Sequence, residues 1–125
     1  TQEERMNAVH LKLRVIESAV KDKRVVLIDD SIVRGTTIAN LIKRLRAAGA
    51  LEVHVRISAP PFLHPCYYGT DVPDNSQLIA NGSSTEEIRQ RIGADSLEYM
   101  SLEDLSQMTG ELPLCKACFD NNYPV

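Results

Sequence analysis

The spacing of hydrophobic residues along the chain predicts the order of its helices and strands. Residues 25–28 form a wholly apolar run, which is typical of a strand buried on both faces of a parallel sheet. Apolar residues recur at helical spacing over 38–48, and Gly49 follows at the position where glycine ends a helix. Apolar and polar residues alternate over 53–57, as in a second strand. The segment 25–58 is therefore predicted to form one β-α-β unit.

The rest of the chain is less regular. Residues 2–20 fit a helix face and an alternating strand equally well, so we leave them undecided. Prolines 60, 61, 65 and 73 predict a long ordered loop after Ser58, and such loops are usually functional. A helix capped at Ser84 and ending near Gly93, a strand at 97–100, a short helix at 101–108 and an irregular tail at 112–125 should follow.

Composition narrows the class of protein. A chain of 125 residues with 43% hydrophobic and 25% charged residues fits one globular domain with its own core. The net charge of −3 argues against a nucleic-acid partner or an anionic membrane surface. No apolar run approaches the roughly 20 residues that span a bilayer, and the charged start is unlike a secretory signal. We expect a cytoplasmic location and, because the first residue is Thr1, a fragment of a longer protein.

The strongest chemical signal is the run Asp29-Asp30-Ser31-Ile32-Val33-Arg34-Gly35-Thr36-Thr37 after the first strand. A parallel sheet places its ligands at the carboxyl edge of its strands, where these two carboxylates stand. The start of the next helix offers free backbone N–H groups and hydroxyls to a phosphate. Acids for hydroxyl groups or Mg²⁺, next to a phosphate cradle, predict a ribose 5-phosphate ligand.

Other interpretations of this run are weaker. In one alternative, Asp30 or Ser31 only caps the helix and Asp29 lies at a solvated strand end. For a bare Asp-Asp pair this alternative has roughly even odds, but the full run 29–37 makes it much weaker. A Walker-type nucleotide loop is excluded because its Gly-Lys-Ser/Thr ending is missing, and the dinucleotide fingerprint fails because its spaced glycines are missing.

Three cysteines form the second candidate site. Cys115 and Cys118 have C-x-x-C spacing, and Cys66 lies far upstream in the proline-rich loop. An odd number of cysteines disfavours a disulfide framework, whereas zinc, iron-sulfur and redox sites all remain open on spacing alone. Three reduced, packed cysteines are the structural alternative, at roughly one in four.

The run 29–37 resembles the phosphoribosyl-pyrophosphate motif of type I phosphoribosyltransferases, and its form is similar to that of the glutamine amidotransferase branch. The resemblance spans nearly the whole chain. Further matches are Gln2, Arg5, Lys12-Leu13, Ala48-Gly49-Ala50, Glu52-Val53, Pro60-Pro61, Tyr68-Gly69, 86–90 and 92–95. It implies a parallel sheet flanked by helices as part of a phosphoribosyltransferase domain over 1–110, with a cysteine-bearing tail over 111–125.

The resemblance also implies roles for individual residues. Asp29 and Asp30 would bind the ribose hydroxyls and Mg²⁺, and residues 31–37 would wrap the 5-phosphate. Lys12 would contact the pyrophosphate, and the alternative that it is an ordinary solvated surface lysine has odds of roughly one in three. Cys66, Cys115 and Cys118 look like three of four ligands of the four-iron four-sulfur cluster of one subgroup, with the fourth ligand before Thr1.

The implied reaction is the first committed step of de novo purine synthesis. Ammonia from glutamine attacks the anomeric carbon of phosphoribosyl pyrophosphate and pyrophosphate leaves. Family members are usually homotetramers under purine-nucleotide feedback. Because the glutaminase domain lies outside this sequence, we expect the chain by itself not to turn over. A salvage phosphoribosyltransferase would not explain the three cysteines, and Lys12 and the acid pair argue weakly against a regulatory nucleotide-binding module.

Overall fold

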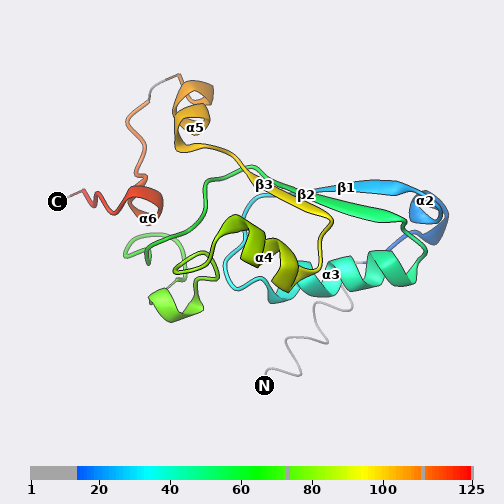
Figure 1. Cartoon of the computed structure of the whole chain (residues 1–125). Coiled ribbons are helices and arrows are strands. Elements are labelled where there is room, and N and C mark those ends of the chain that lie inside the picture. The colour runs from blue at the N-terminus through cyan, green and yellow to red at the C-terminus, as the bar shows by residue number, and fades with distance from the viewer. Residues whose placement is uncertain (1–13, 73, 111, 125) are drawn as a thin grey trace.

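The computed structural model describes residues 14–72, 74–110 and 112–124 (Figure 1). Lys12 and most of the undecided N-terminal segment lie outside these ranges. The described part begins with a four-residue helix, α2 (Glu17–Val20), at one end of the sheet. No helix in the described ranges has the length and apolar character needed to cross a membrane.

Three parallel strands form the sheet. They are β1 (Arg24–Asp29), β2 (Glu52–Ile57) and β3 (Ser96–Tyr99), in the order β1-β2-β3. Asp29 at the end of β1 is opposite Ile57, which is in turn opposite Tyr99. The carboxyl ends of all three strands therefore meet at one edge. The predicted α/β class with a parallel sheet is confirmed, and the third strand starts one residue earlier than predicted.

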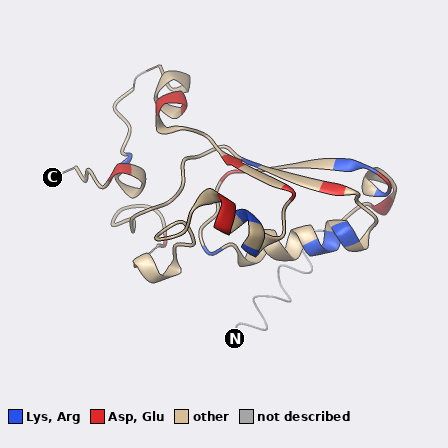
Figure 2. Ribbon diagram, viewed as in Figure 1, with Lys and Arg blue, Asp and Glu red and all other residues tan. Residues whose placement is uncertain are grey.

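Two helices cover one face of this sheet (Figure 1). Helix α3 (Thr36–Ala47) buries Ile38, Ile42 and Leu45, which recur at the spacing of a single helix face. Its end carries Arg44 and Arg46, whose charges suit the negative end of the helix dipole (Figure 2). Gly49, with φ of +95°, lets the Ala50 N–H return to the Leu45 carbonyl, as predicted for a glycine-terminated helix.

Helix α4 (Thr85–Ile92) has the predicted cap at its start. The Ser84 hydroxyl accepts from the Glu87 N–H, and the Glu87 carboxylate accepts from the Ser84 N–H. Its buried residues Ile88 and Ile92 join those of α3 and the inner faces of β2 and β3 in one core. The core members with the least exposure are Ile42, Val53, Val55 and Ile88. The β-α-β unit is thus the support on which everything at the carboxyl edge depends.

The first strand is not buried on both faces, so that part of the prediction is wrong. Val25 and Leu27 face the helices and the core, but the side chains of Val26 and Ile28 are 60% and 73% exposed. The reason is that the described helices α3 and α4 both cover the opposite face of the sheet. A continuous apolar run cannot show which of its two faces finds a partner.

The remaining segments follow the predicted sequence of elements with one difference. A short 3-10 helix, η1 (Asn75–Gln77), lies in the proline-rich loop, and α5 (Leu102–Met108) is capped by the Ser101 hydroxyl. The tail was predicted to be irregular, but it contains a single helical turn, α6 (Ala117–Asp120). Ala117 is buried there, so packing supports a turn that the local sequence does not signal. The division of the chain at residue 110 stays a prediction.

Candidate functional site

The predicted ligand loop lies where β1 passes into α3. We call residues 29–37 the phosphate loop. Asp29 is the last residue of β1, and Gly35 stands directly before the helix that begins at Thr36. The loop therefore occupies the carboxyl edge of the sheet, where parallel α/β folds bind their ligands.

Each of the two carboxylates keeps one oxygen without a partner among the described residues. Asp29 Oδ1 accepts from the Asp30 N–H at 2.9 Å, and Asp30 Oδ1 accepts from the Ser31 hydroxyl at 2.9 Å. Within the described ranges, Oδ2 of neither residue forms a hydrogen bond or ion pair. Asp29 is half-buried and Asp30 is exposed. Two hard oxygen acceptors are thus available side by side to a hydroxyl or a cation.

The backbone N–H groups of the phosphate loop are also free. From Ser31 to Thr37 none of them donates to any atom of the described residues. They stand at the N-terminus of a twelve-residue helix, which carries a partial positive charge. Because buried or ordered amides rarely go without partners, a turn with this many free donors is suited to an anion.

The loop takes its shape from the segment that follows η1. The Ile79 N–H donates to the Val33 carbonyl at 2.8 Å, and the Arg34 guanidinium donates to the Gln77 side chain. Gly35 has φ of +80°, and a Cβ there would lie 2.6 Å from Ile79 Cδ1. Glycine suits this position because the backbone angle is left-handed, and a Cβ would also require the Ile79 side chain to shift.

The structure sorts the predicted loop residues by what each can offer. Asp29, Asp30 and the amides of 31–37 come together at one place. The Ile32 side chain is buried in the core, so only its backbone faces a ligand. Thr36 and Thr37 are exposed and keep their hydroxyls available. Arg34 is different, because its side chain turns to Gln77 and lines a separate cleft.

That cleft has a volume of about 600 Å³. Its polar lining consists of Arg34, Asn75, Ser76, Gln77, Asn81 and Arg91. Neither of the two aspartates nor either loop threonine lines it. No local pattern predicts this cleft, because its residues come from three separate stretches of the chain.

The cysteines belong to a second region, which we call the cysteine region and define as residues 62–70 and 115–124. The Leu63 and His64 N–H groups donate to the Cys118 carbonyl, at 2.9 and 3.0 Å. The Tyr123 hydroxyl donates to the Pro65 carbonyl, and the Tyr68 hydroxyl to the Pro124 carbonyl, both at 2.7 Å. The ring pairs Phe62–Phe119 and Tyr67–Tyr123 add contacts at centroid distances of 5.1 and 4.9 Å. The tail is therefore fastened to the proline-rich loop.

These contacts bring the three thiols into one neighbourhood. Hydrogen bonds from the backbone N–H groups of Tyr68 and Thr70 lower the pKa of Cys66 to about 7. Burial raises the pKa of the Cys118 thiol, and the charges of Cys66 and Cys115 raise it further. Among the described residues no three His, Cys, Asp or Glu side chains converge closely enough for a metal ion. Tyr67 and Tyr123, which stack beside the thiols, were not predicted.

One polar atom at the carboxyl edge of the sheet was also missed. The Tyr99 hydroxyl is buried and has no hydrogen-bond partner in the described part of the chain. Burial raises the pKa of this tyrosine to about 12, so it remains a neutral phenol at neutral pH. A tyrosine at the end of a predicted strand is a common residue of a protein core, so its sequence position does not predict that its hydroxyl lacks a partner.

Comparisons with known proteins point to one enzyme. No family model matches the sequence. A curated relative named amidophosphoribosyltransferase, from Pyrococcus horikoshii, is 54% identical over 116 residues, which cover 93% of this chain and 26% of the relative. The Bacillus subtilis relative of the same name is 48% identical, with 96% of this chain and 26% of the relative covered. The chain thus spans about a quarter of the curated relatives it matches.

Solved structures agree with these relatives. The glutamine phosphoribosylpyrophosphate amidotransferase from B. subtilis, complexed with ADP and GMP, matches with a TM-score of 0.81 and 45% identity. The match covers 99% of this chain and 29% of that one. A structure described as the allosteric regulatory enzyme of purine biosynthesis matches with a TM-score of 0.80 and 46% identity, over 92% of this chain and 27% of that one.

Proposed function

Nearly the whole of this chain is homologous to a segment that makes up about a quarter of each matching amidophosphoribosyltransferase, and we propose that it is the corresponding part of such an enzyme. The enzyme joins ammonia from glutamine to phosphoribosyl pyrophosphate and releases pyrophosphate, as the first committed step of purine synthesis. Besides the homology, one structural observation supports the proposal. The unpaired backbone amides of 31–37 lie beside Asp29 and Asp30, each of which has one oxygen unengaged among the described residues. They are the groups that a ribose 5-phosphate needs.

The phosphate loop holds the sugar phosphate in this proposal. The amides of 31–37 and the hydroxyls of Thr36 and Thr37 bind the 5-phosphate. The free oxygens of Asp29 and Asp30 accept from the ribose hydroxyls. Lys12 neutralises the pyrophosphate, although it lies outside the described residues.

The carboxylate pair also fits Mg²⁺. This ion prefers oxygen ligands, and it is usually held by one or two carboxylates together with substrate phosphates. Asp29 and Asp30 have the matching number of carboxylates, with one oxygen of each unengaged. When bound, the ion would neutralise charge on the leaving pyrophosphate.

The proposed reaction depends more on how the substrate is positioned than on a side-chain nucleophile. A nitrogen–carbon bond forms at the anomeric carbon as its bond to the pyrophosphate oxygen breaks, with inversion, and the attacking ammonia then gives up a proton. The transition state resembles an oxocarbenium ion. Fixing the ribose through Asp29, Asp30 and the loop amides therefore lowers the barrier mainly by orientation and by placement of charge.

An iron-sulfur cluster is the proposed occupant of the cysteine region. Cys66, Cys115 and Cys118 supply three thiols in one neighbourhood, and backbone N–H groups donate to the Cys66 sulfur, for example Thr70 at 3.4 Å. Such hydrogen bonds are common around cluster ligands, and four cysteines are the normal set. Among the described residues the thiols do not converge as the ligands of one metal ion would, so the assignment to three positions of a four-iron four-sulfur cluster rests on the family resemblance. Such a cluster would fasten the tail and take no part in the reaction.

The proposals on regulation and assembly rest on the relatives of this chain. The B. subtilis structure holds ADP and GMP, so we propose that purine nucleotides bind and inhibit this enzyme as well. We also propose a homo-oligomer that acts in the cytoplasm.

Ligand binding by the chain itself tests the proposal. We expect ribose 5-phosphate with Mg²⁺ to shift the backbone amide resonances of 31–37 in two-dimensional NMR spectra. Asp29→Asn should weaken this binding at least tenfold, because it removes a charged acceptor. Asp22→Asn is the matched control, since Asp22 is exposed and precedes β1 at the opposite end of the strand.

Activity tests the remainder. In the full-length protein, Asp29→Asn should lower ammonia-dependent pyrophosphate release by at least a hundredfold with the fold unchanged. The isolated chain should form no product from glutamine. Binding of ribose 5-phosphate that leaves the amides of 31–37 unshifted would contradict the assignment.

A further inference from the structure

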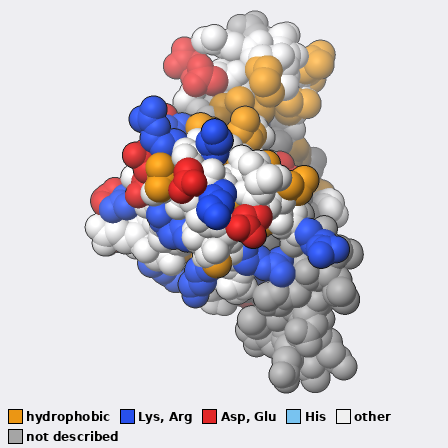
Figure 3. All heavy atoms as spheres, turned by 90° about the vertical axis from the view of Figure 1, so that its right-hand side faces the viewer, with side chains coloured by type: hydrophobic (Ala, Val, Ile, Leu, Met, Phe, Trp, Pro, Cys, Tyr) orange, Lys and Arg blue, Asp and Glu red, His pale blue; other side chains and the backbone are white. Residues whose placement is uncertain are grey.

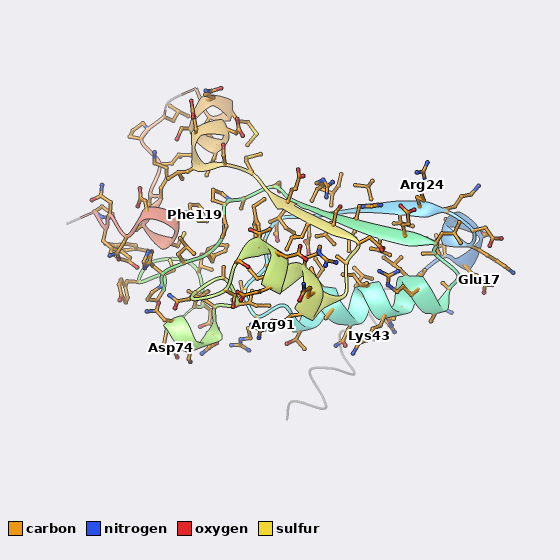
Figure 4. All side chains as sticks on the ribbon, viewed as in Figure 1. Glu17, Arg24, Lys43, Asp74, Arg91 and Phe119 are labelled. Carbon is orange, nitrogen blue, oxygen red and sulfur yellow. The ribbon has the colours of Figure 1, made fainter. Side chains whose placement is uncertain are left out.

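The cleft beside η1 has features of a ligand site that are separate from the phosphate loop. We call it the arginine cleft, after Arg34 and Arg91, which reach it from the loop and from α4 (Figure 4 labels Arg91). Its volume of about 600 Å³ lies within the range of roughly 300–1,000 Å³ that is usual for small-molecule sites. Clefts of this size are common on proteins, so the charge of the lining is more informative than the volume.

Neither arginine of the cleft is neutralised by a residue that the structure describes. The Arg34 guanidinium donates to the neutral Gln77 side chain, and Arg91 Nη1 donates to the Ser83 hydroxyl at 3.5 Å. No carboxylate in the described ranges forms an ion pair with either of them.

Other arginines of the same molecule behave differently. Arg89, on the same helix as Arg91, pairs with Glu86 at 2.6 Å, and Arg46 pairs with Asp95 at 2.8 Å. The face turned to the viewer in Figure 3 likewise shows basic and acidic side chains mixed together. Arg24 also forms no ion pair in the described ranges, so what distinguishes Arg34 and Arg91 is that both line the same cleft, and this favours an anionic ligand.

The other lining groups favour a phosphate monoester over a carboxylate. A single arginine can satisfy a carboxylate through one bidentate contact, whereas a phosphate has three terminal oxygens. Asn75 adds a side-chain amide beside the two arginines, and Asn81 adds a second amide, one N–H of which donates to the Leu63 carbonyl. The Ser76 hydroxyl donates to Asp74, so it lines the cleft as an acceptor. Leu78 and Ile79 line the same cleft and give an apolar surface to the organic part of a ligand.

We propose that the arginine cleft binds a small phosphate monoester at a site distinct from the phosphate loop. Arg34 then serves this cleft, and the loop holds its own phosphate through backbone amides. The two sites share the Val33–Ile79 hydrogen bond, so a ligand in the cleft contacts the segment that shapes the loop. The proposal does not depend on the enzymatic function.

Phenyl phosphate is a suitable probe because it joins a phosphate to an apolar ring. Titrated into the 125-residue chain, it should shift the backbone amide resonances of Gln77, Leu78 and Asn81 in a saturable way. Arg91→Gln should weaken this binding at least tenfold, and Arg91→Lys should weaken it less. Lys43→Gln is the matched control, because Lys43 is an exposed cation on α3 that does not line the cleft (Figure 4). Benzoate should bind at least tenfold more weakly than phenyl phosphate.

The outcomes separate this site from the phosphate loop. Equal affinity of the parent and Arg91→Gln chains, with the fold unchanged, would overturn the proposal. So would shifts confined to 31–37, which would assign the phosphate to the loop alone. Shifts at 77–81 that Arg91→Gln abolishes, with those at 31–37 retained, would support the cleft even if the chain had no role in purine synthesis.

Discussion

The phosphate loop and the cysteine region use their polar groups in opposite ways. The loop consists of nine consecutive residues, and its amides from Ser31 to Thr37 find no partner in the described structure. The cysteine region joins two segments about fifty residues apart, and their amides, carbonyls and hydroxyls bond to each other. The first region has its donors available to a ligand, and the second uses them to hold the tail in place.

This difference shows where each region obtains its rigidity. The loop cannot be held by its own hydrogen bonds if its amides are to bind a phosphate. It is fixed instead by the Val33–Ile79 bond, by the buried Ile32 and by the close approach of Gly35 to Ile79. Preorganised donors of this kind bind an anion without reorganisation.

Gly35→Ala should break the loop with the largest effect. The loop would hold alanine at a left-handed backbone angle, and the alanine Cβ would lie 2.6 Å from Ile79 Cδ1. We expect a loss of about 3 kcal/mol in the free energy of unfolding, from roughly 1–2 kcal/mol of backbone strain and a similar cost of overpacking. Urea denaturation measures this loss, and ribose 5-phosphate binding should fall with it.

Gly82→Ala separates the two contributions. Gly82 has nearly the same φ, +82°, but a Cβ there meets no atom within 4 Å. It should cost only about 1–2 kcal/mol, the backbone share. If the two variants were equally stable, Ile79 would not be what holds the loop.

The same contrast explains how much could be predicted from sequence. The loop, its strand and its helix are contiguous, so apolar spacing and the Asp-Asp pair were enough to predict them. The Ser84 capping box and the glycine end of α3 are also local signals, and both are confirmed.

Contacts between distant segments gave no such signal. The exposed face of β1, the arginine cleft and the stacking of Tyr67 on Tyr123 all depend on which segments meet in space. Spacing left the cysteines with several possible roles, and only the family resemblance singled out one. Their grouping is apparent in the structure because the tail folds back onto the proline-rich loop.

Low pH should destabilise the support of the phosphate loop more than the cysteine region. A carboxylate, Asp95, holds that support, whereas the contacts of the cysteine region described above involve no carboxylate. Asp95 Oδ2 accepts from the Val53 N–H at 2.7 Å and from Arg46 at 2.8 Å. The hydrogen bond from Val53, followed by Arg46, lowers the pKa of Asp95 below its ordinary 3.8. A lowered pKa stabilises the fold above pH 3.8, and this contribution is lost as the pH falls through the folded-state value.

Asp95→Asn should therefore cost about 1 kcal/mol at pH 7, a figure reduced because the side chain is 37% exposed. The difference from the parent chain should shrink below pH 3. Glu98→Gln is the control, since Glu98 is 73% exposed and 3.9 Å from Arg56, and it should change stability by less than about 0.5 kcal/mol. Urea denaturation at pH 7 and pH 2.5 provides the measurement, and an Asp95→Asn deficit that does not depend on pH would contradict the assignment.

Tyr123→Phe should loosen the cysteine region alone, with the smallest effect. It removes the hydrogen bond to the Pro65 carbonyl but keeps the ring on Tyr67, so we expect a local loss of about 1 kcal/mol. The amides of Leu63 and His64 donate to the tail, so their hydrogen exchange should quicken about fivefold. Tyr67→Phe removes a hydroxyl that bonds to no described residue, and it should change neither rate. Changed hydrogen exchange at the amides of 31–37 in Tyr123→Phe would mean that the two regions are coupled and do not hold their structure independently.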